Sequence, residues 1–175
     1  RNGWMNFTDF QILPIEDAEQ ALLRCCGSQN WANKMAQSRP FGSLEAMHKA
    51  ATRIWEDLKV QDWLEAFEHH PRIGDRQALA ARFASTRDWS ANEQAGVEVA
   101  EEDILDRLTS GNDKYSQRFG YVFLVCASGK SAFEMLNLLE ARINNSPEEE
   151  LQIAQQEQQK IMLLRLNKMF EEPKK

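Results

Sequence analysis

Cysteine and histidine are scarce in this chain, and their scarcity limits the kinds of site it can hold. Among its 175 residues there are three cysteines and three histidines. Cys25 and Cys26 are adjacent and Cys126 is left over, which is a poor framework for disulfides. We therefore expect a reduced, cytoplasmic protein in which the two helical cysteines act as small apolar core residues.

Long apolar runs and an excess of basic charge are missing as well. The longest apolar run covers residues 121–127, far short of the roughly 20 residues that span a bilayer. The net charge is −6, from 27 acidic and 21 basic residues, whereas nucleic acids and anionic membranes bind basic surfaces. We expect neither of them as the main partner.

Motifs for metals and nucleotide cofactors are absent too. Adjacent side chains on a helix point about 100° apart, so His69 and His70 do not readily share one ion. No H-x-x-x-H or C-x-x-C spacing supplies further ligands, and no glycine-rich phosphate-binding loop occurs. We expect a site without metal and without cofactor.

Helical periodicity is present along nearly the whole chain. Ser43 opens an amphipathic pattern, Pro71 disfavours helical geometry at the residue before it, Gly111 is a stop signal, and Ser146 with Pro147 begins the last helix. The expected helices cover residues 15–27, 28–41 (broken before Pro40), 43–58, 60–70, 77–84, 90–111, 131–145 and 146–173.

Only residues 119–129 suggest extended structure, and with no partner strand they cannot form a sheet. A glutamine-rich stretch at residues 155–160 is expected to be a solvated helix face. The predicted fold class is therefore all-α, a single-domain helical bundle over residues 1–175 with one short extended segment. Residues 1–4 are expected to be a cloning remnant or disordered.

His70 stands in the last turn of its predicted helix, and two explanations fit it. A histidine near a helix C-terminus can be a favourable cation and nothing more. Alternatively, Pro71 restricts the backbone of His70 and helps to hold its imidazole in one place, as a general acid or base requires. His48 lies within a helical pattern and is expected to be structural or exposed.

Glu93 belongs to the stretch "SANEQ" at residues 90–94, which matches a capping box. In that case Ser90 and Glu93 only satisfy free amides at the start of a helix. A helix N-terminus can also attract an anion and orient a carboxylate for chemistry, and Gln94 adds a neutral donor and acceptor beside it. Both explanations stay open.

Arg165 is the only charged residue in the apolar stretch 161–166, which argues for burial. A buried guanidinium needs an anion, which either a protein carboxylate or a substrate carboxylate could supply. Alternatively, the long side chain reaches out to water.

Four stretches in this order resemble one family: "HHPRIGD" at 69–75, "SANEQ" at 90–94, "RFGYVFLVCA" at 118–127 and "KIMLLRL" at 160–166. Together with the opening at residues 12–35, they are similar to the 2-oxo-4-hydroxy-4-carboxy-5-ureidoimidazoline (OHCU) decarboxylases. The first stretch resembles bacterial members, and Val122 stands where the family often has proline. The resemblance covers almost the whole chain.

The resemblance implies an all-helical, cofactor-free enzyme that converts OHCU to (S)-allantoin and CO2, the last step from urate to allantoin, and that commonly forms a homodimer. It implies a catalytic group of His70, Glu93 and Arg165. The residues that it places against the substrate are Pro71, Ser90, Gln94, Phe123, Leu124, Val125, Cys126 and Ala127.

The implied chemistry needs few protein groups. The OHCU carbon that loses CO2 neighbours a carbon–nitrogen double bond that can accept the electrons, so neither pyridoxal phosphate nor thiamine is required. Two other classes stay open: a related ureide-processing enzyme on the same fold, and a helical ligand-binding module without catalysis.

Overall fold

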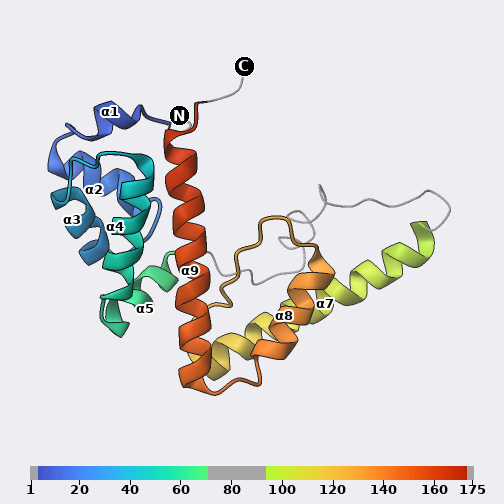
Figure 1. Ribbon diagram of the computed structural model, residues 1–175. Coiled ribbons are helices and arrows are strands. Elements are labelled where there is room, and N and C mark those ends of the chain that lie inside the picture. The colour runs from blue at the N-terminus through green and yellow to red at the C-terminus, as the bar shows by residue number, and fades with distance from the viewer. Residues whose placement is uncertain (1–3, 71–93, 173–175) are drawn as a thin grey trace. The chain divides into compact units, whose positions relative to one another are not determined.

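Every regular element in the described part of the chain is a helix (Figure 1). The computed structural model describes residues 4–70 and 94–172, with side chains from residue 101 onward in the second range. These ranges contain no strand, so the all-α prediction is confirmed, and none of their helices is long and apolar enough to cross a membrane. The helices are α1 (Phe7–Phe10), α2 (Ile15–Leu23), α3 (Gln29–Gln37), α4 (Leu44–Glu56), α5 (Val60–Glu68), α7 (Gln94–Phe119), α8 (Ala132–Arg142) and α9 (Pro147–Phe170).

The chain divides into two compact units. The first joins residues 1–70 to residues 155–175, and the second covers residues 71–154. Helix α9 therefore contributes its first two turns to the second unit and the rest of its length to the first. The helix expected at residues 77–84 lies outside the described residues.

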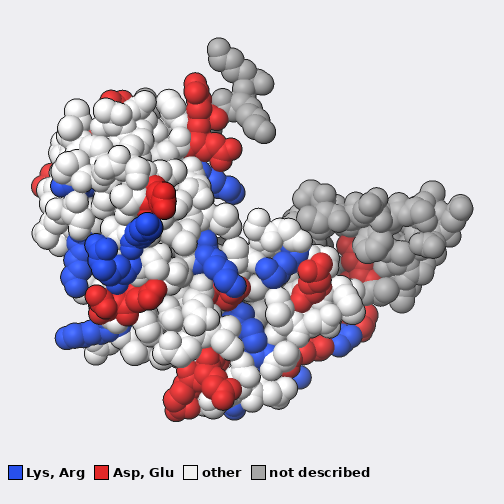
Figure 2. All heavy atoms as spheres, viewed as in Figure 1, with Lys and Arg blue, Asp and Glu red and all other residues white. Residues whose placement is uncertain are grey.

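Serine side chains begin four of the helices that the sequence predicts, and that of Ser28 accepts a hydrogen bond from the amide of Trp31 at 3.2 Å at the start of α3. Ser43 and Ser131 each accept a hydrogen bond from the amide three residues further on, at 3.0 and 3.1 Å. Ser146 does the same at 3.2 Å, with Pro147 in the first position of α9. Acidic residues fill the first turn of α9, and Figure 2 shows acidic side chains gathered at this end of the helix. Negative charge there complements the helix dipole.

Tryptophans form the centre of the first unit. Trp31 and Trp55 are completely buried. The indole nitrogen of Trp31 donates to the carbonyl of Ala51 at 3.2 Å, and that of Trp55 donates to the backbone and side-chain oxygens of Gln155 at 3.1 and 3.0 Å. These bonds let the large rings be buried without leaving a polar group unsatisfied. The bond from Trp55 also fixes α9 against α4.

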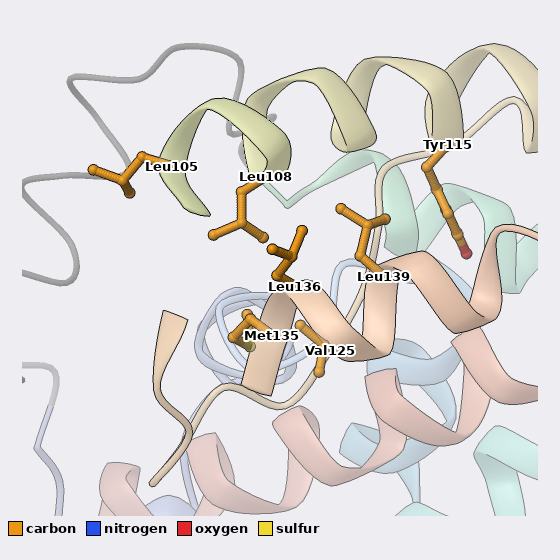
Figure 3. Close-up of a cluster of buried hydrophobic side chains, with 7 residues drawn as sticks. All are labelled: Leu105, Leu108, Tyr115, Val125, Met135, Leu136 and Leu139. Carbon is orange, nitrogen blue, oxygen red and sulfur yellow. The ribbon is translucent and has the colours of Figure 1, made fainter. Parts of the chain in front are cut away.

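An aliphatic and aromatic cluster holds the second unit together, where α8 packs along α7 (Figure 3). In the figure, Leu108 of α7 and Leu136 of α8 face each other, and Val125 approaches from the segment between these helices. The buried members of the cluster are Leu105, Leu108, Tyr115, Val125, Met135, Leu136 and Leu139.

The prediction that Gly111 ends a helix is wrong, because α7 continues through it to Phe119. A Cβ at Gly111 would lie 2.6 Å from Cδ2 of Leu139, which is completely buried. Glycine at this position therefore lets α8 approach α7 closely. A glycine that stops a helix and one that makes room for a neighbour look alike in the sequence.

The segment between α7 and α8 has no regular structure. The chain leaves α7 at Gly120, with a φ of 83°, and turns again at Gly129, with a φ of 74°. Glycine takes up such left-handed conformations at little cost. The segment expected to be extended pairs with no strand in residues 94–172, so it adds no sheet to the fold.

Candidate active site

The structure describes some of the predicted site residues and leaves others undescribed. His70 and Arg165 belong to the first unit, and residues 123–127 belong to the second. Gln94 is the first residue of α7, and its side chain is not among those described. The predicted site residues outside the described ranges are Pro71, Ser90 and Glu93.

Helix α5 carries His70 at its C-terminal end, within two residues of the predicted boundary. The last helical residue is Glu68, and His69 is the C-cap. The backbone N–H of His70 still donates to the carbonyl of Phe67 at 3.2 Å. Phe67 is completely buried, so the backbone that carries His70 is anchored in the core of the first unit.

The two adjacent histidines have different surroundings. His69 is exposed, and its Nδ1 lies 3.0 Å from the carbonyl oxygen of Glu65. Its ring also packs so closely on Gly27 that a Cβ there would collide with Cγ of His69. The ring of His69 therefore contacts Glu65 and Gly27. The ring of His70, by contrast, is half-buried and turned toward another helix.

The imidazole of His70 meets Gln158 of α9. Its Nε2 lies 2.5 Å from Oε1 of Gln158, whose side chain is completely buried. Burial lowers the pKa of His70 below its usual 6.5, the hydrogen bond to Gln158 acts in the opposite direction, and the positive charge of Arg165 lowers the pKa further. A histidine with a lowered pKa is neutral near pH 7 and can act as a base.

Arg165 lies on the surface of α9, and its predicted burial is wrong. Its side chain is exposed, as is that of its neighbour Leu164. No carboxylate among residues 4–70 and 101–172 forms an ion pair with it. The alternative, that the long side chain reaches out to water, is the arrangement found. The guanidinium is nonetheless close enough to His70 to lower the pKa of that histidine. Because the guanidinium is also exposed, it is available to an anionic or carbonyl-rich ligand near His70.

The cysteines of the first unit are buried, as expected for core residues. Burial raises the pKa of both Cys25 and Cys26 to about 12. A neutral thiol is a poor nucleophile, and neither cysteine is a candidate for catalysis.

Residues 123–127 turn most of their side chains inward. Leu124, Val125 and Cys126 are buried, so a ligand at this segment would meet mainly its backbone. The carbonyl of Leu124 accepts from Nη1 of Arg142 at 2.7 Å, and that of Cys126 accepts from Nζ of Lys130 at 2.9 Å. These two hydrogen bonds connect the backbone of the segment to Arg142 of α8 and to Lys130 just before it.

Gln158 contacts His70, and no motif in the sequence marks it as a site residue. The stretch 155–160 was expected to be solvated, but the structure buries Gln155, Glu157 and Gln158. A spacing signal was available, because Gln158 precedes Arg165 by seven residues and so lies on the same face of an α-helix. Within the described residues no group of three or more histidine, cysteine, aspartate or glutamate side chains could hold a metal ion.

Comparison with known proteins identifies relatives over most of the chain. The model of the OHCU decarboxylase family matches residues 11–167. The uric acid degradation bifunctional protein TTL of Arabidopsis thaliana is 35% identical over 163 residues, which are 93% of this chain and 50% of that protein. The OHCU decarboxylase of Haloferax volcanii is 28% identical over 144 residues, covering 79% of this chain and 80% of that protein.

A solved structure agrees with these relatives. The crystal structure of an OHCU decarboxylase in the presence of (S)-allantoin superposes with a TM-score of 0.70 at 35% identity, covering 87% of this chain and 97% of that one. The chain spans half the length of the Arabidopsis protein, and 28% and 26% of two bifunctional Bacillus proteins that it also matches. Because the family model covers nearly the whole sequence, the chain belongs to the OHCU decarboxylase family.

Proposed function

We propose that this chain decarboxylates OHCU to (S)-allantoin and CO2, with His70 moving the protons of the reaction. One observation carries the proposal: in a chain of this family, the half-buried imidazole of His70 has a lowered pKa and lies within the field of Arg165. A neutral, fixed imidazole near pH 7 is what a proton-transfer step needs. The relatives named above are decarboxylases or urate-degrading proteins of the same family.

The reaction proceeds in two steps. In the first, the bond between the ring carbon and its carboxylate breaks and CO2 leaves. The released electron pair forms a double bond to the neighbouring ring carbon, while the electrons of the carbon–nitrogen double bond move to nitrogen, which takes up one proton. In the second, the hydroxyl of this enediol-like intermediate loses its proton and becomes a carbonyl, and the neighbouring carbon gains a proton. His70 exchanges protons with the hydroxyl and with the intermediate.

The proposed roles of the other groups follow from their charge. Arg165 binds a ring or ureido oxygen and stabilises the negative charge that develops there. Glu93 fixes ring or ureido N–H groups, and its negative charge near the departing carboxylate favours loss of CO2. Further substrate contacts are proposed for Pro71, Ser90, Gln94, Phe123, Leu124, Val125, Cys126 and Ala127.

Three further properties belong to the same proposal. The enzyme needs no cofactor, because the substrate accepts its own electrons. It forms a homodimer, as the family resemblance implies. It works in the cytoplasm as one functional domain, which agrees with its buried thiols and with the extent of the family match.

The handedness of the product tests the proposed function. In water the planar intermediate is protonated from both faces and gives racemic allantoin. The protein should instead accelerate the decay of OHCU and give optically active (S)-allantoin. Circular dichroism measures this optical activity. The rate should be the same with and without a metal chelator. Racemic product formed at the uncatalysed rate would mean that the chain is a non-catalytic module. Loss of activity on chelation, restored by zinc, would contradict the cofactor-free mechanism.

A further inference from the structure

Gln158 is buried in a way that stability alone does not explain. Its side chain is completely buried and its Oε1 faces Nε2 of His70. Its amide nitrogen is buried as well and has no hydrogen-bond partner among the described residues. An unsatisfied buried donor costs about 1–3 kcal/mol, so an apolar side chain of similar size would serve the core better.

The direction of the hydrogen bond decides which nitrogen of His70 is free for chemistry. The amide oxygen of Gln158 can only accept, so Nε2 of His70 must carry the hydrogen. In a neutral imidazole the lone pair then lies on Nδ1. We propose that Gln158 is a positioning residue that holds His70 as its Nε2–H tautomer and leaves Nδ1 to take up and release the proton of the reaction. This inference rests on the proposed role of His70.

The protonation state of His70 fits this role. Burial keeps its pKa low, which leaves the ring neutral near pH 7 with one hydrogen to be placed. The bond to Gln158 places that hydrogen on Nε2. It also fixes the ring against rotation, because Trp55 anchors α9 through the backbone carbonyl of Gln155, which a substitution of the Gln155 side chain keeps. An imidazole held in one tautomer presents the same atom to every substrate molecule.

Gln155 provides a matched control in the same helix. It is also buried, at 7% exposure, but its Oε1 accepts from the indole nitrogen of Trp55 at 3.0 Å. The two glutamines are three residues apart and bind different partners. Replacing each by methionine separates an effect on the protonation of His70 from an effect on the packing of α9.

Nuclear magnetic resonance of ¹⁵N-labelled histidine reads the tautomer directly. The signals of His70 are assigned by their loss in His70→Asn. Above neutral pH, the wild type should carry hydrogen on Nε2 and none on Nδ1. Gln158→Met should lose this preference, and both tautomers should appear. Gln158→Glu should keep the hydrogen on Nε2 and raise the pKa of His70, because a carboxylate then lies beside the ring.

Turnover of OHCU and thermal melting complete the experiment. Gln158→Met should lower kcat by roughly 10–100-fold, the scale for groups that orient a metal-bound imidazole, with little change in KM and no fall in Tm. In Gln158→Glu, the pH profile of kcat/KM should move to higher pH. Gln155→Met should lower Tm and leave both the tautomer and the kcat of the folded protein as in the wild type.

Two results would overturn the inference. One is a wild-type His70 with its hydrogen on Nδ1. The other is a Gln158→Met protein with an unchanged tautomer and normal kcat, which would make Gln158 a structural residue. The spectra need no substrate, so a wild type that shows the Nε2–H form but does not decarboxylate OHCU would refute the proposed function and not the effect of Gln158 on His70.

Discussion

Arg142 and Glu150 form an ion pair that is buried inside the second unit. Nη2 of Arg142 lies 2.6 Å from Oε2 of Glu150, and their side chains are 8% and 0% exposed. The hydroxyl of Tyr115 donates to the same carboxylate oxygen, and Nδ2 of Asn145 donates to the other at 3.1 Å. Because Arg142 also donates to the carbonyl of Leu124, the pair connects α8 and α9 with the segment proposed to bind substrate.

Arg142→Met should strongly destabilise the protein. It leaves the carboxylate of Glu150 buried without its cation, and breaking a buried pair in this way costs about 3–5 kcal/mol. The free energy of unfolding in urea measures the loss. The double substitution Arg142→Met with Glu150→Met should cost less than the sum of the single ones, since it removes both charges.

The pair formed by Arg107 and Glu140 is the control. Its Nη2 and Oε1 are 2.7 Å apart, but both side chains are about half exposed, at 48% and 46%. Water and salt screen such a pair, so Arg107→Met should hardly change Tm. Equal falls in Tm for Arg107→Met and Arg142→Met would mean that burial of the Arg142 pair does not matter to stability.

Gly111→Ala should destabilise the protein although alanine is the better helix former. Propensity alone favours alanine in α7 by about 1 kcal/mol. The new Cβ would meet Leu139 at 2.6 Å, and overpacking a core costs about 1–3 kcal/mol. We expect the steric cost to prevail, because Leu139 is completely buried among its neighbours, and Tm should fall.

Gly42→Ala is the matched control for this substitution. Among the described residues, apart from its two chain neighbours, no atom lies within 4 Å of a Cβ built there, so Tm should stay nearly constant. Shortening the neighbour should relieve the clash: Gly111→Ala should cost less in a Leu139→Ala background than in the wild type. A rise in Tm for Gly111→Ala alone would show that α8 can move away without loss.

The helix starts could be predicted from the sequence because their signals are local. Ser43 and Ser131 each precede an apolar pattern and satisfy the first free amides, and both structural bonds are present. Gly111 shows the limit of such signals, since only its contact with Leu139 distinguishes a close approach from a helix end.

The polarity of individual residues in α9 does not predict which of them are buried. Gln158 looked solvated and is buried, whereas Arg165 looked buried and is exposed. Both outcomes depend on which neighbours face the helix, and these neighbours come from segments far away in the chain. The helix end before Pro71, by contrast, could be predicted from the proline and the helix pattern, because α5 ends at Glu68 with His69 as its C-cap.

Acidification should destabilise the wild type more than His70→Asn. Burial lowers the pKa of His70 in the folded protein below the 6.5 of the unfolded chain, so the unfolded chain binds the proton more readily. Stability is therefore lost as the pH falls below about 6.5, and asparagine at position 70 removes this contribution. Urea unfolding at a series of pH values from about 8 down to about 5, which bracket the ordinary pKa of histidine, measures the difference.

Substitution of the two adjacent histidines should also have different effects on turnover. His70→Asn should lower kcat by roughly 10²–10⁴-fold, the usual contribution of a general acid or base. His69→Asn should change kcat only slightly. In the wild type, kcat/KM should fall with acidification at a pH below 6.5, because the pKa of His70 lies below that value. Equal losses of activity at both positions, or an unchanged pH dependence of stability in His70→Asn, would contradict the role given to His70.

Arg165→Met should reduce activity without reducing stability. The guanidinium is exposed and forms no ion pair with a carboxylate among the described residues, so its loss strands no buried charge of the kind that makes broken pairs costly. Methionine covers a similar apolar area of α9, and Tm should stay close to that of the wild type. If the partner of Arg165 is the substrate, kcat/KM for OHCU and binding of allantoin should both fall.

Arg165→Lys distinguishes charge from shape at this position. Lysine keeps the positive charge but lacks the planar fork that binds two oxygens at once, so it should recover only part of the activity. A stabilising role for Arg165 predicts the opposite pattern: Tm would drop in Arg165→Met while the folded fraction kept normal turnover. Melting curves and turnover of the wild type and both variants, measured on the same preparations, decide between a residue that binds substrate and one that supports the fold.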